Sequence, residues 1–167
     1  MKGTVLITDQ LSHIGTRVTC PAAVIIKNES ILLGLRNYTP DKWKAISVWT
    51  TPGGRCEEGE TVEIALRREV KEEIGVENLR ILDFIGEIPG AKEGDIVPVF
   101  LCDTDEEPRL MEPEKFSEWK WIPDLSDPLP PCSSNFLGIL FRPVHRPQFS
   151  WGSRTGFLLP AKRRWNL

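Results

Sequence analysis

Three glutamates in one short stretch, Glu69, Glu72 and Glu73, are the residues of this sequence best suited to chemistry. The stretch Thr61 to Ile74 predicts a helix, because apolar residues recur at helical spacing and Gly75 supplies a left-handed C-terminal stop. At about 100° per residue, Glu73 falls about 40° from Glu69, and Glu72 about 60° away on the other side. All three carboxylates therefore flank or enter the stripe with which the helix should meet the protein body.

Carboxylates in such a position lose hydration and repel one another, so they need a positive partner. The nearby Arg67, Arg68 and Lys71 fall mostly on the opposite side of the helix. Glutamates at i, i+3 and i+4 can share a hard cation, and oxygen ligands favour Mg²⁺ or Mn²⁺ over zinc. An exposed helix with ordinary Glu–Arg pairing is the alternative, and the helix alone supports both equally.

The segment Pro52-Gly53-Gly54 stands ahead of this helix. Its two glycines remove side chains where the backbone must bend and approach another group closely. A glycine carbonyl there can add a metal ligand, and exposed amides can meet phosphate oxygens. A tight turn between a strand and a loop is the simpler interpretation, but the acidic helix that follows favours a metal and phosphate site.

Together these residues resemble the signature of the Nudix hydrolase family, G-x5-E-x7-R-E-U-x-E-E-x-G-U, where U is a bulky aliphatic residue. Every fixed position is filled, by Gly54, Glu60, Arg68, Glu69, Val70, Glu72, Glu73, Gly75 and Val76. A chance match at so many fixed positions is rare. The resemblance implies a Nudix-type α/β/α sandwich with a mixed β-sheet. It also implies a nucleotide pyrophosphohydrolase that uses Mg²⁺, with Mn²⁺ as a substitute.

The resemblance assigns roles by position. The implied metal ligands are Glu69, Glu72, Glu73 and the carbonyl of Gly53. Glu60 and Arg68 would brace the loop against the helix, outside the ligands. The implied catalytic residues are Glu69, Glu72 and Glu114. Glu69 is one choice of general base, and Glu114, in the loop 112–115, is the preferred choice within that loop.

The segment 112–123 resembles part of the MutT-type nucleoside triphosphate diphosphatases, and 129–138 resembles the segment with which relatives close over the base. The implied substrate-binding residues are Arg36, Trp49, Gly54 and Phe136. Of these, Arg36 would meet a phosphate, and the two aromatic residues would stack on a base. Core packing is the alternative for each aromatic.

The expected reaction is therefore (d)NTP + H₂O to (d)NMP + pyrophosphate, with oxidised nucleotides among the candidate substrates. Hydrolysis of ADP-ribose or a nucleotide sugar is a second hypothesis. A catalytically silent Nudix domain that senses a nucleotide is a third, against which the complete set of carboxylates weighs. The expected partner is a small nucleotide, with no nucleic acid and with a homodimer left open.

The composition fits one globular domain: 167 residues, 40% hydrophobic, 27% charged and a net charge of −3. No apolar run approaches the ~20 residues that span a bilayer, so no membrane partner is expected. The four cysteines form no C-x-x-C pair. Together with the absence of a secretory signal pattern, this favours a reducing cytoplasm.

We expect a single domain over 1–167, with a core at about 17–141 and a basic, aromatic extension at 142–167 of unknown role. The extension carries six basic and no acidic residues, which leaves 15 basic against 24 acidic residues, or −9, for the remainder. It could close over phosphates or dock on a second subunit. A solvated tail is the alternative.

Apolar runs predict the strands that must position the helix. Strands are expected at 17–27, 31–35, 48–51, 79–88, 96–102 and 118–122, with a short final helix at 133–141. An edge strand at 4–8 is the one element suggested for the first fifteen residues. Strands interleaved with two helices indicate an α/β domain with a mixed sheet.

Overall fold

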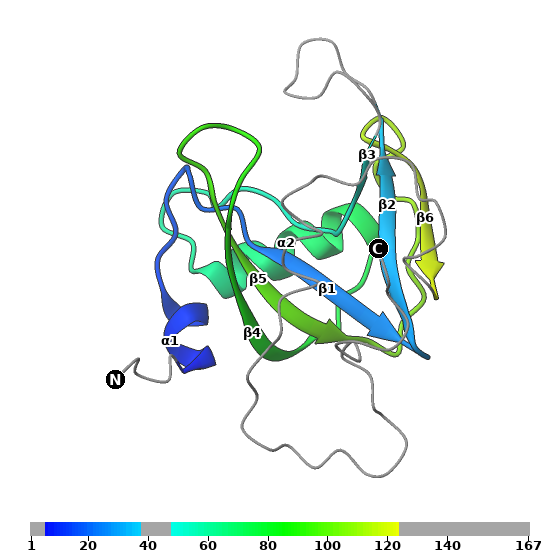
Figure 1. Cartoon of the computed structure of the whole chain (residues 1–167), viewed down its shortest axis with the longest axis horizontal. Coiled ribbons are helices and arrows are strands. Elements are labelled where there is room, and N and C mark those ends of the chain that lie inside the picture. Colours follow the sequence, from blue (N-terminus) through cyan, green and yellow to red (C-terminus); the bar gives the residue numbers. More distant parts are fainter. Residues whose placement is uncertain (1–5, 38–47, 124–167) are drawn as a thin grey trace, which may run out of the picture.

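The computed structural model describes residues 6–37 and 48–123. In chain order its elements are α1 (Ile7–Ser12), β1 (Ala22–Lys27), β2 (Ser30–Arg36), β3 (Val48–Thr50), α2 (Val62–Ile74), β4 (Arg80–Pro89), β5 (Ile96–Asp103) and β6 (Phe116–Ile122). The strands form one mixed sheet, and α2 lies along it beside β1 and β5 (Figure 1). The α/β class and the mixed sheet expected from the sequence are confirmed. Neither helix of the described ranges is long and apolar enough to cross a membrane.

The sheet divides along β2. Its strand order is β3-β2-β1-β5-β4, and β6 pairs with β2 as well. Among the strands of 6–37 and 48–123, only β1 and β5 run parallel. The ladder between β1 and β2 contains just Ile26↔Ile31 and Lys27↔Ser30, whereas β3 pairs with Gly34–Arg36 farther along β2. β1 therefore pairs with the beginning of β2, and β3 pairs with its end. Between β1 and β3 the sheet is open, and residues there can line a site.

Both ends of α2 are capped, the C-terminal end by the Gly75 that the sequence predicts and the N-terminal end by Thr61. The Thr61 hydroxyl accepts a hydrogen bond from the backbone N–H of Ile64 at 3.3 Å. Gly75 adopts the left-handed conformation (φ 70°, ψ 15°) and donates its N–H to the carbonyl of Lys71. These caps satisfy backbone groups that a helix end would otherwise leave unpaired.

The two faces of the sheet bury different clusters. One cluster joins the apolar side of α2 (Val62, Leu66, Val70 and Ile74) to Ala23, Ile25, Phe100 and Cys102. The other contains Val24, Leu33, Trp49, Val99 and Leu101. Residues alternate between the clusters along β1 and β5, as the two-residue period of a strand requires. The buried side of α2 includes one charged residue in its last turn, Glu73, which agrees with the helical-wheel prediction.

Two expectations for the N-terminal part were wrong. The strand predicted over 17–27 begins only at Ala22, because Pro21 lacks an N–H and interrupts the ladder. The edge strand predicted over 4–8 is wrong, since Ile7–Ser12 forms helix α1. Ile7 and Leu11 lie one helical turn apart, and both pack against the core cluster of α2. The helix predicted over 133–141 lies outside the described residues.

Candidate active site

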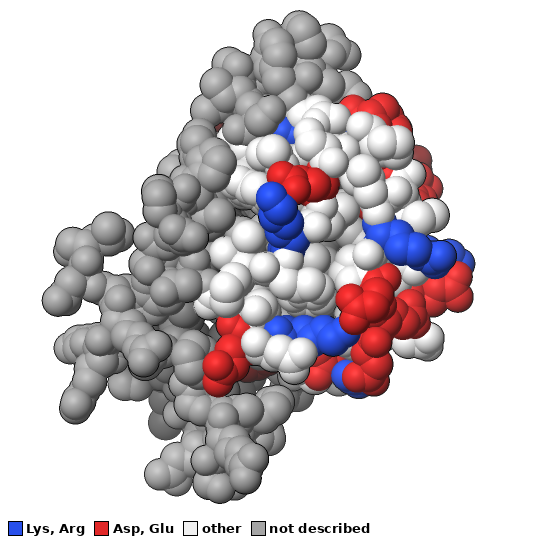
Figure 2. Space-filling model, turned by 90° about the vertical axis from the view of Figure 1, so that its right-hand side faces the viewer, with Lys and Arg blue, Asp and Glu red and all other residues white. Residues whose placement is uncertain are grey.

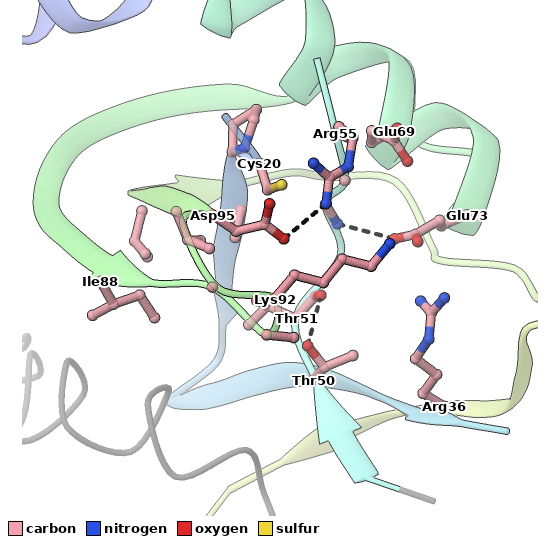
Figure 3. A pocket seen from close by; sticks show the side chains of 18 of the residues that line it. Cys20, Arg36, Thr50, Thr51, Arg55, Glu69, Glu73, Ile88, Lys92 and Asp95 are labelled. Carbon is pink, nitrogen blue, oxygen red and sulfur yellow. Dashed lines mark hydrogen bonds and ion pairs between the residues drawn. The ribbon is translucent and has the colours of Figure 1, made fainter. Parts of the chain in front are cut away.

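A pocket of about 370 Å³ opens at the divided part of the sheet. Its walls come from the start of β1, the end of β2, β3, the segment 53–55, the tip of the β4–β5 hairpin and α2. One end is charged, with Arg36, Glu69 and Glu73, whereas Ile88 lies at the other end (Figure 3). Val97 and Val99 add further apolar surface. Such a pocket suits a ligand with an anionic part and an apolar part.

Tight packing around the backbone explains the paired glycines, against Pro21 at Gly53 and against Glu69 at Gly54. The backbone N–H of Gly53 donates to Oε2 of Glu73 at 3.0 Å. Gly53 has φ +149°, and a Cβ there would lie 2.3 Å from the carbonyl oxygen of Pro21. A Cβ on Gly54 would lie 2.3 Å from the carboxylate carbon of Glu69. Glycine is thus needed both for the conformation and for the space.

Burial changes the acidity of the two carboxylates that line the pocket. Glu73 is only 2% exposed. This burial raises the pKa of its carboxyl to about 8, helped by the nearby charges of Glu69 and Glu112 and opposed by the Gly53 N–H and by Arg36. Burial also raises the pKa of Glu69, against the effect of its hydrogen bond from Arg68. A cation bound among these groups would favour their charged forms.

Arg68 connects the acidic residues of the signature. It donates from Nε and Nη2 to both oxygens of Glu60, at 2.8 and 2.9 Å. Its Nη1 lies 2.8 Å from Oε1 of Glu69 and 3.2 Å from Oε2 of Glu72. Nη2 also donates to the carbonyl of Arg55 at 3.0 Å. The structure therefore brings together the four charged residues, and Arg68 links the loop to the helix.

The predicted substrate-binding residues have different positions. Arg36 lines the pocket, and its guanidinium lies 5.5 Å from the ring centre of Phe116. Trp49 is 4% exposed and packs in the core cluster with Val24 and Leu33. It does not line the pocket, so its position supports core packing, the alternative interpretation of that residue. Phe136 lies outside the described residues.

The structure distinguishes the two glutamates of the loop 112–115. Neither glutamate is among the residues that line the pocket, but Glu114 is exposed whereas Glu112 is half-buried. Glu112 lies within electrostatic range of Glu73. Its Oε1 accepts from Nζ of Lys115 at 2.6 Å, and its buried Oε2 has no hydrogen-bond partner in the described part of the chain. The arrangement favours Glu112 over Glu114 as the candidate base, because Glu112 lies near the buried Glu73 whereas Glu114 is exposed.

The end of α2 holds this loop in place. The backbone N–H of Arg109 donates to the carbonyl of Ile74 at 2.9 Å, and that of Met111 donates to the carbonyl of Glu73 at 3.3 Å. Helix ends leave carbonyls unpaired, and here the loop supplies their donors. Glu112 follows directly. No short-range sequence signal distinguishes it from Glu114, because the choice depends on contacts between distant segments.

Sequence reasoning also missed several charged residues of the pocket: Arg55, Lys92, Asp95 and Lys115. Lys115 lies close enough to Glu69 and Glu73 for its pKa to feel both charges. The side chain of Lys92 runs across the pocket from the hairpin tip (Figure 3). Lys92, Lys115, Arg36 and Arg55 thus place four cations around one pocket, which suits a polyanionic ligand.

The donor chemistry fits a hard divalent cation. Within 6–37 and 48–123, no three Asp, Glu, His or Cys side chains already surround one point. Instead, Glu69 contacts Arg68, and Glu73 accepts from Gly53. The carboxylates of Glu69 and Glu73 offer oxygen atoms, however, and the buried Oε2 of Glu112 has no partner among the described residues. Oxygen donors of this kind are those that Mg²⁺ and Mn²⁺ prefer.

The chain belongs to the NUDIX domain family, whose model matches residues 18–125. An RNA pyrophosphohydrolase of Gluconobacter oxydans is 34% identical over 94 residues, which are 45% of this chain and 55% of that protein. The NAD-capped RNA hydrolase NudC of Haemophilus influenzae (strain PittGG) is 30% identical over 128 residues, 72% of this chain and 46% of that protein. This chain thus spans about half the length of the curated relatives it matches.

Among solved structures, the MutT NUDIX hydrolase of Burkholderia pseudomallei is similar. Its TM-score is 0.55 at 29% identity, over 72% of this chain and 94% of that one. The family and the fold expected from the nine signature positions are therefore confirmed. Divalent metal ions, Mg²⁺ above all, are typical of the family. The roles of individual residues stay predictions.

Proposed function

We propose that this chain hydrolyses nucleoside triphosphates to the monophosphate and pyrophosphate, with Mg²⁺ as cofactor. One observation carries the proposal. Two carboxylates suited to a metal ion, Glu69 and Glu73, share a pocket with four cations and an apolar end. The charged end has the chemistry for a phosphate chain, and the apolar end has the chemistry for a base.

Each charged group has a distinct proposed task. Glu69 and Glu73 hold the metal ion, with the Gly53 carbonyl and Glu72 as further ligands. Arg68 keeps the carboxylate of Glu69 oriented through its 2.8 Å contact. When bound, the metal ion neutralises phosphate charge and acidifies the attacking water.

Residues outside the signature complete the proposed mechanism. Glu112 accepts the proton of the attacking water, since its Oε2 has no partner in the described part of the chain. Arg36 and Lys115 bind phosphate oxygens at the charged end of the pocket. No covalent intermediate on the protein is needed, because the water attacks phosphorus directly.

A second candidate substrate is the 5′ end of an RNA. It is favoured by the two curated relatives, which are named as an RNA pyrophosphohydrolase and an NAD-capped RNA hydrolase. On the β6 side of the molecule, most visible Lys and Arg side chains lie beside acidic ones (Figure 2). Lys120, for example, lies 2.9 Å from Glu118. That described surface offers no continuous basic track for an RNA strand, so the small nucleotide is preferred.

Product analysis tests the proposal. The panel contains dNTPs, 8-oxo-dGTP, ADP-ribose, a nucleotide sugar and a 5′-triphosphate RNA, each with Mg²⁺ and with EDTA. Monophosphate plus pyrophosphate from a free triphosphate, lost with EDTA, is the expected result. Pyrophosphate release from RNA alone would favour the second candidate, and AMP from ADP-ribose alone would favour the nucleotide-sugar branch. No turnover on any of these would contradict the proposal and favour a sensor domain.

A matched pair of variants on α2 tests the site itself. Glu73→Gln should abolish most Mg²⁺-dependent turnover and keep the fold, because it removes a buried charge with little change in volume. Glu63→Gln is the control, since Glu63 lies on the same helix and pairs with Arg67 at 41% exposure. Equal activity in the two variants would argue against Glu73 as a metal ligand.

A further inference from the structure

The tip of the β4–β5 hairpin forms one wall of the pocket. Its residues Ile88, Pro89, Gly90, Ala91 and Lys92 all line the cavity. Asp95 closes the tip, since its carbonyl accepts from the N–H of Gly90 at 2.8 Å and its N–H donates to the carbonyl of Lys92 at 3.1 Å. A Cβ on Gly90 would lie 2.4 Å from the Cβ of Asp95, so the tip is tightly packed.

Asp95 also holds the tip to the opposite wall. Its Oδ2 lies 2.7 Å from Nη2 of Arg55, and the Asp95 side chain is only 7% exposed. Nη1 of Arg55 donates to the carbonyl of Arg17. Arg55 follows Gly54, where an added Cβ would overlap the carboxylate of Glu69. The Arg55–Asp95 pair therefore joins the hairpin tip to the loop beside the proposed metal ligands.

Breaking this ion pair should change the conformation of the hairpin tip more than that of the opposite wall. A buried carboxylate without a positive partner is strongly unfavourable, so Asp95 would move toward water if Arg55 no longer contacted it. Arg55 is 39% exposed and would be hydrated in place. Movement of Asp95 would disturb the two backbone hydrogen bonds that shape the tip, and with them the wall from 88 to 92.

The pair meets between the two ends of the pocket. Figure 3 shows Arg55 and Asp95 between Ile88 on one side and Glu69 and Glu73 on the other. Neither residue belongs to the proposed metal ligands. A change in their contact should therefore alter how the pocket fits a nucleoside, and it should leave the ligands of the reacting phosphate in place.

We propose that the Arg55–Asp95 ion pair is a positioning element that holds the hairpin tip against the nucleoside part of the substrate. It sets substrate affinity and takes no part in the chemical step. The inference rests on the proposed nucleotide pyrophosphohydrolase function. It predicts a rise in KM, not a fall in kcat, when the pair is broken.

The test compares Asp95→Asn with Asp103→Asn in the full chain. Asp103 pairs with Arg80 at the other end of the same hairpin, so its variant makes the same chemical change far from the pocket, where Arg80 keeps its second partner Asp105. Asp95→Asn should raise KM for the best triphosphate of the panel about tenfold and keep kcat within about threefold. Asp103→Asn should leave both constants unchanged. Hydrogen exchange in the segment 88–95 should rise in Asp95→Asn alone.

Two further variants guard against a trivial loss of folding. Arg55→Lys keeps the charge but loses the planar fork, and should raise KM less than Asp95→Asn does. The exchanged pair Arg55→Asp with Asp95→Arg should recover part of the lost affinity. An unchanged KM in Asp95→Asn, or a fall in kcat alone, would overturn the proposal.

Hydrogen exchange separates this proposal from the proposed function. If the wild-type protein hydrolyses nothing in the panel, the proposed function fails. In that case, faster exchange confined to 88–95 in Asp95→Asn still supports the part of the proposal in which the pair holds the hairpin tip in place. Exchange equal to wild type in that segment overturns it, whatever the activity.

Discussion

The backbone N–H of Gly53 and the carboxylate of Glu73 lie 3.0 Å apart, although 20 residues separate them in the chain. This contact fixes the glycine loop against the buried end of α2. It also partly offsets the rise in pKa that burial causes at Glu73. The loop and the helix are thus positioned by the same acidic group that is proposed to bind the metal ion.

The stability of the metal-free protein should depend on pH through Glu73. Its pKa rises from 4.5 to about 8 in the folded protein, so the folded state holds the proton more tightly than the unfolded chain. The free energy of unfolding should therefore decrease as pH rises through this interval. Urea unfolding in EDTA at several pH values would measure it. Glu73→Gln should lack this part of the decrease, and an identical slope in both proteins would contradict the assignment.

Gly54→Ala should weaken the proposed metal site while the helix stays folded. The new Cβ would lie 2.3 Å from the carboxylate carbon of Glu69, so that carboxylate must move. We expect about a tenfold loss in apparent Mg²⁺ affinity, in the range typical when groups that orient a metal ligand are changed. Activity measured across a Mg²⁺ titration would show it. If Gly54→Ala kept the wild-type Mg²⁺ dependence, the backbone at residue 54 would have moved and the Glu69 carboxylate would have stayed in place.

The two loop glutamates make a matched pair for the general base. Glu112→Gln should lower kcat by about 100-fold or more, because general-base catalysis typically contributes that much. Glu114→Gln should behave like wild type, since its side chain is exposed to solvent. Single-turnover rates of both variants would distinguish them. The opposite result would restore Glu114 as the base.

Trp49 should contribute to stability and not to substrate affinity. It is 4% exposed and packs with Val24 and Leu33. Truncation to alanine should reduce the free energy of unfolding by about 3–5 kcal/mol, as is typical of large buried aromatic residues. The milder Trp49→Phe variant should fold and keep the wild-type KM. A raised KM in that variant, with unchanged stability, would instead support stacking on a base.

The signature residues were predictable because they lie close together in the chain. Helical periodicity and the Gly75 stop are local properties, so α2 and its acidic end followed from the sequence. The Gly53–Gly54 loop followed from its position ahead of that helix. The order of strands was likewise readable, apart from the N-terminal segment, where Pro21 shortens β1.

Contacts between distant segments account for what the sequence did not indicate. Glu112 and Glu114 look alike in a one-dimensional pattern, and only the anchoring of their loop on α2 distinguishes them. Asp95 and Arg55 are separated by 40 residues, and neither occupies a fixed position of the signature. Trp49 stands in a strand whose two sides face different surroundings, so its direction depends on the pairing of β3 with β2.

The hydrogen bonds from Arg109 and Met111 to the last carbonyls of α2 have a consequence for how activity is lost. Because of these bonds, the positions of the proposed base, Glu112, and of a proposed metal ligand, Glu73, both depend on the last turn of α2. Fraying of that turn would displace both residues together. Molecules with the turn open would therefore have no catalytic activity, instead of a reduced rate. On warming, turnover should then disappear in one step, ahead of the cooperative melting of the sheet.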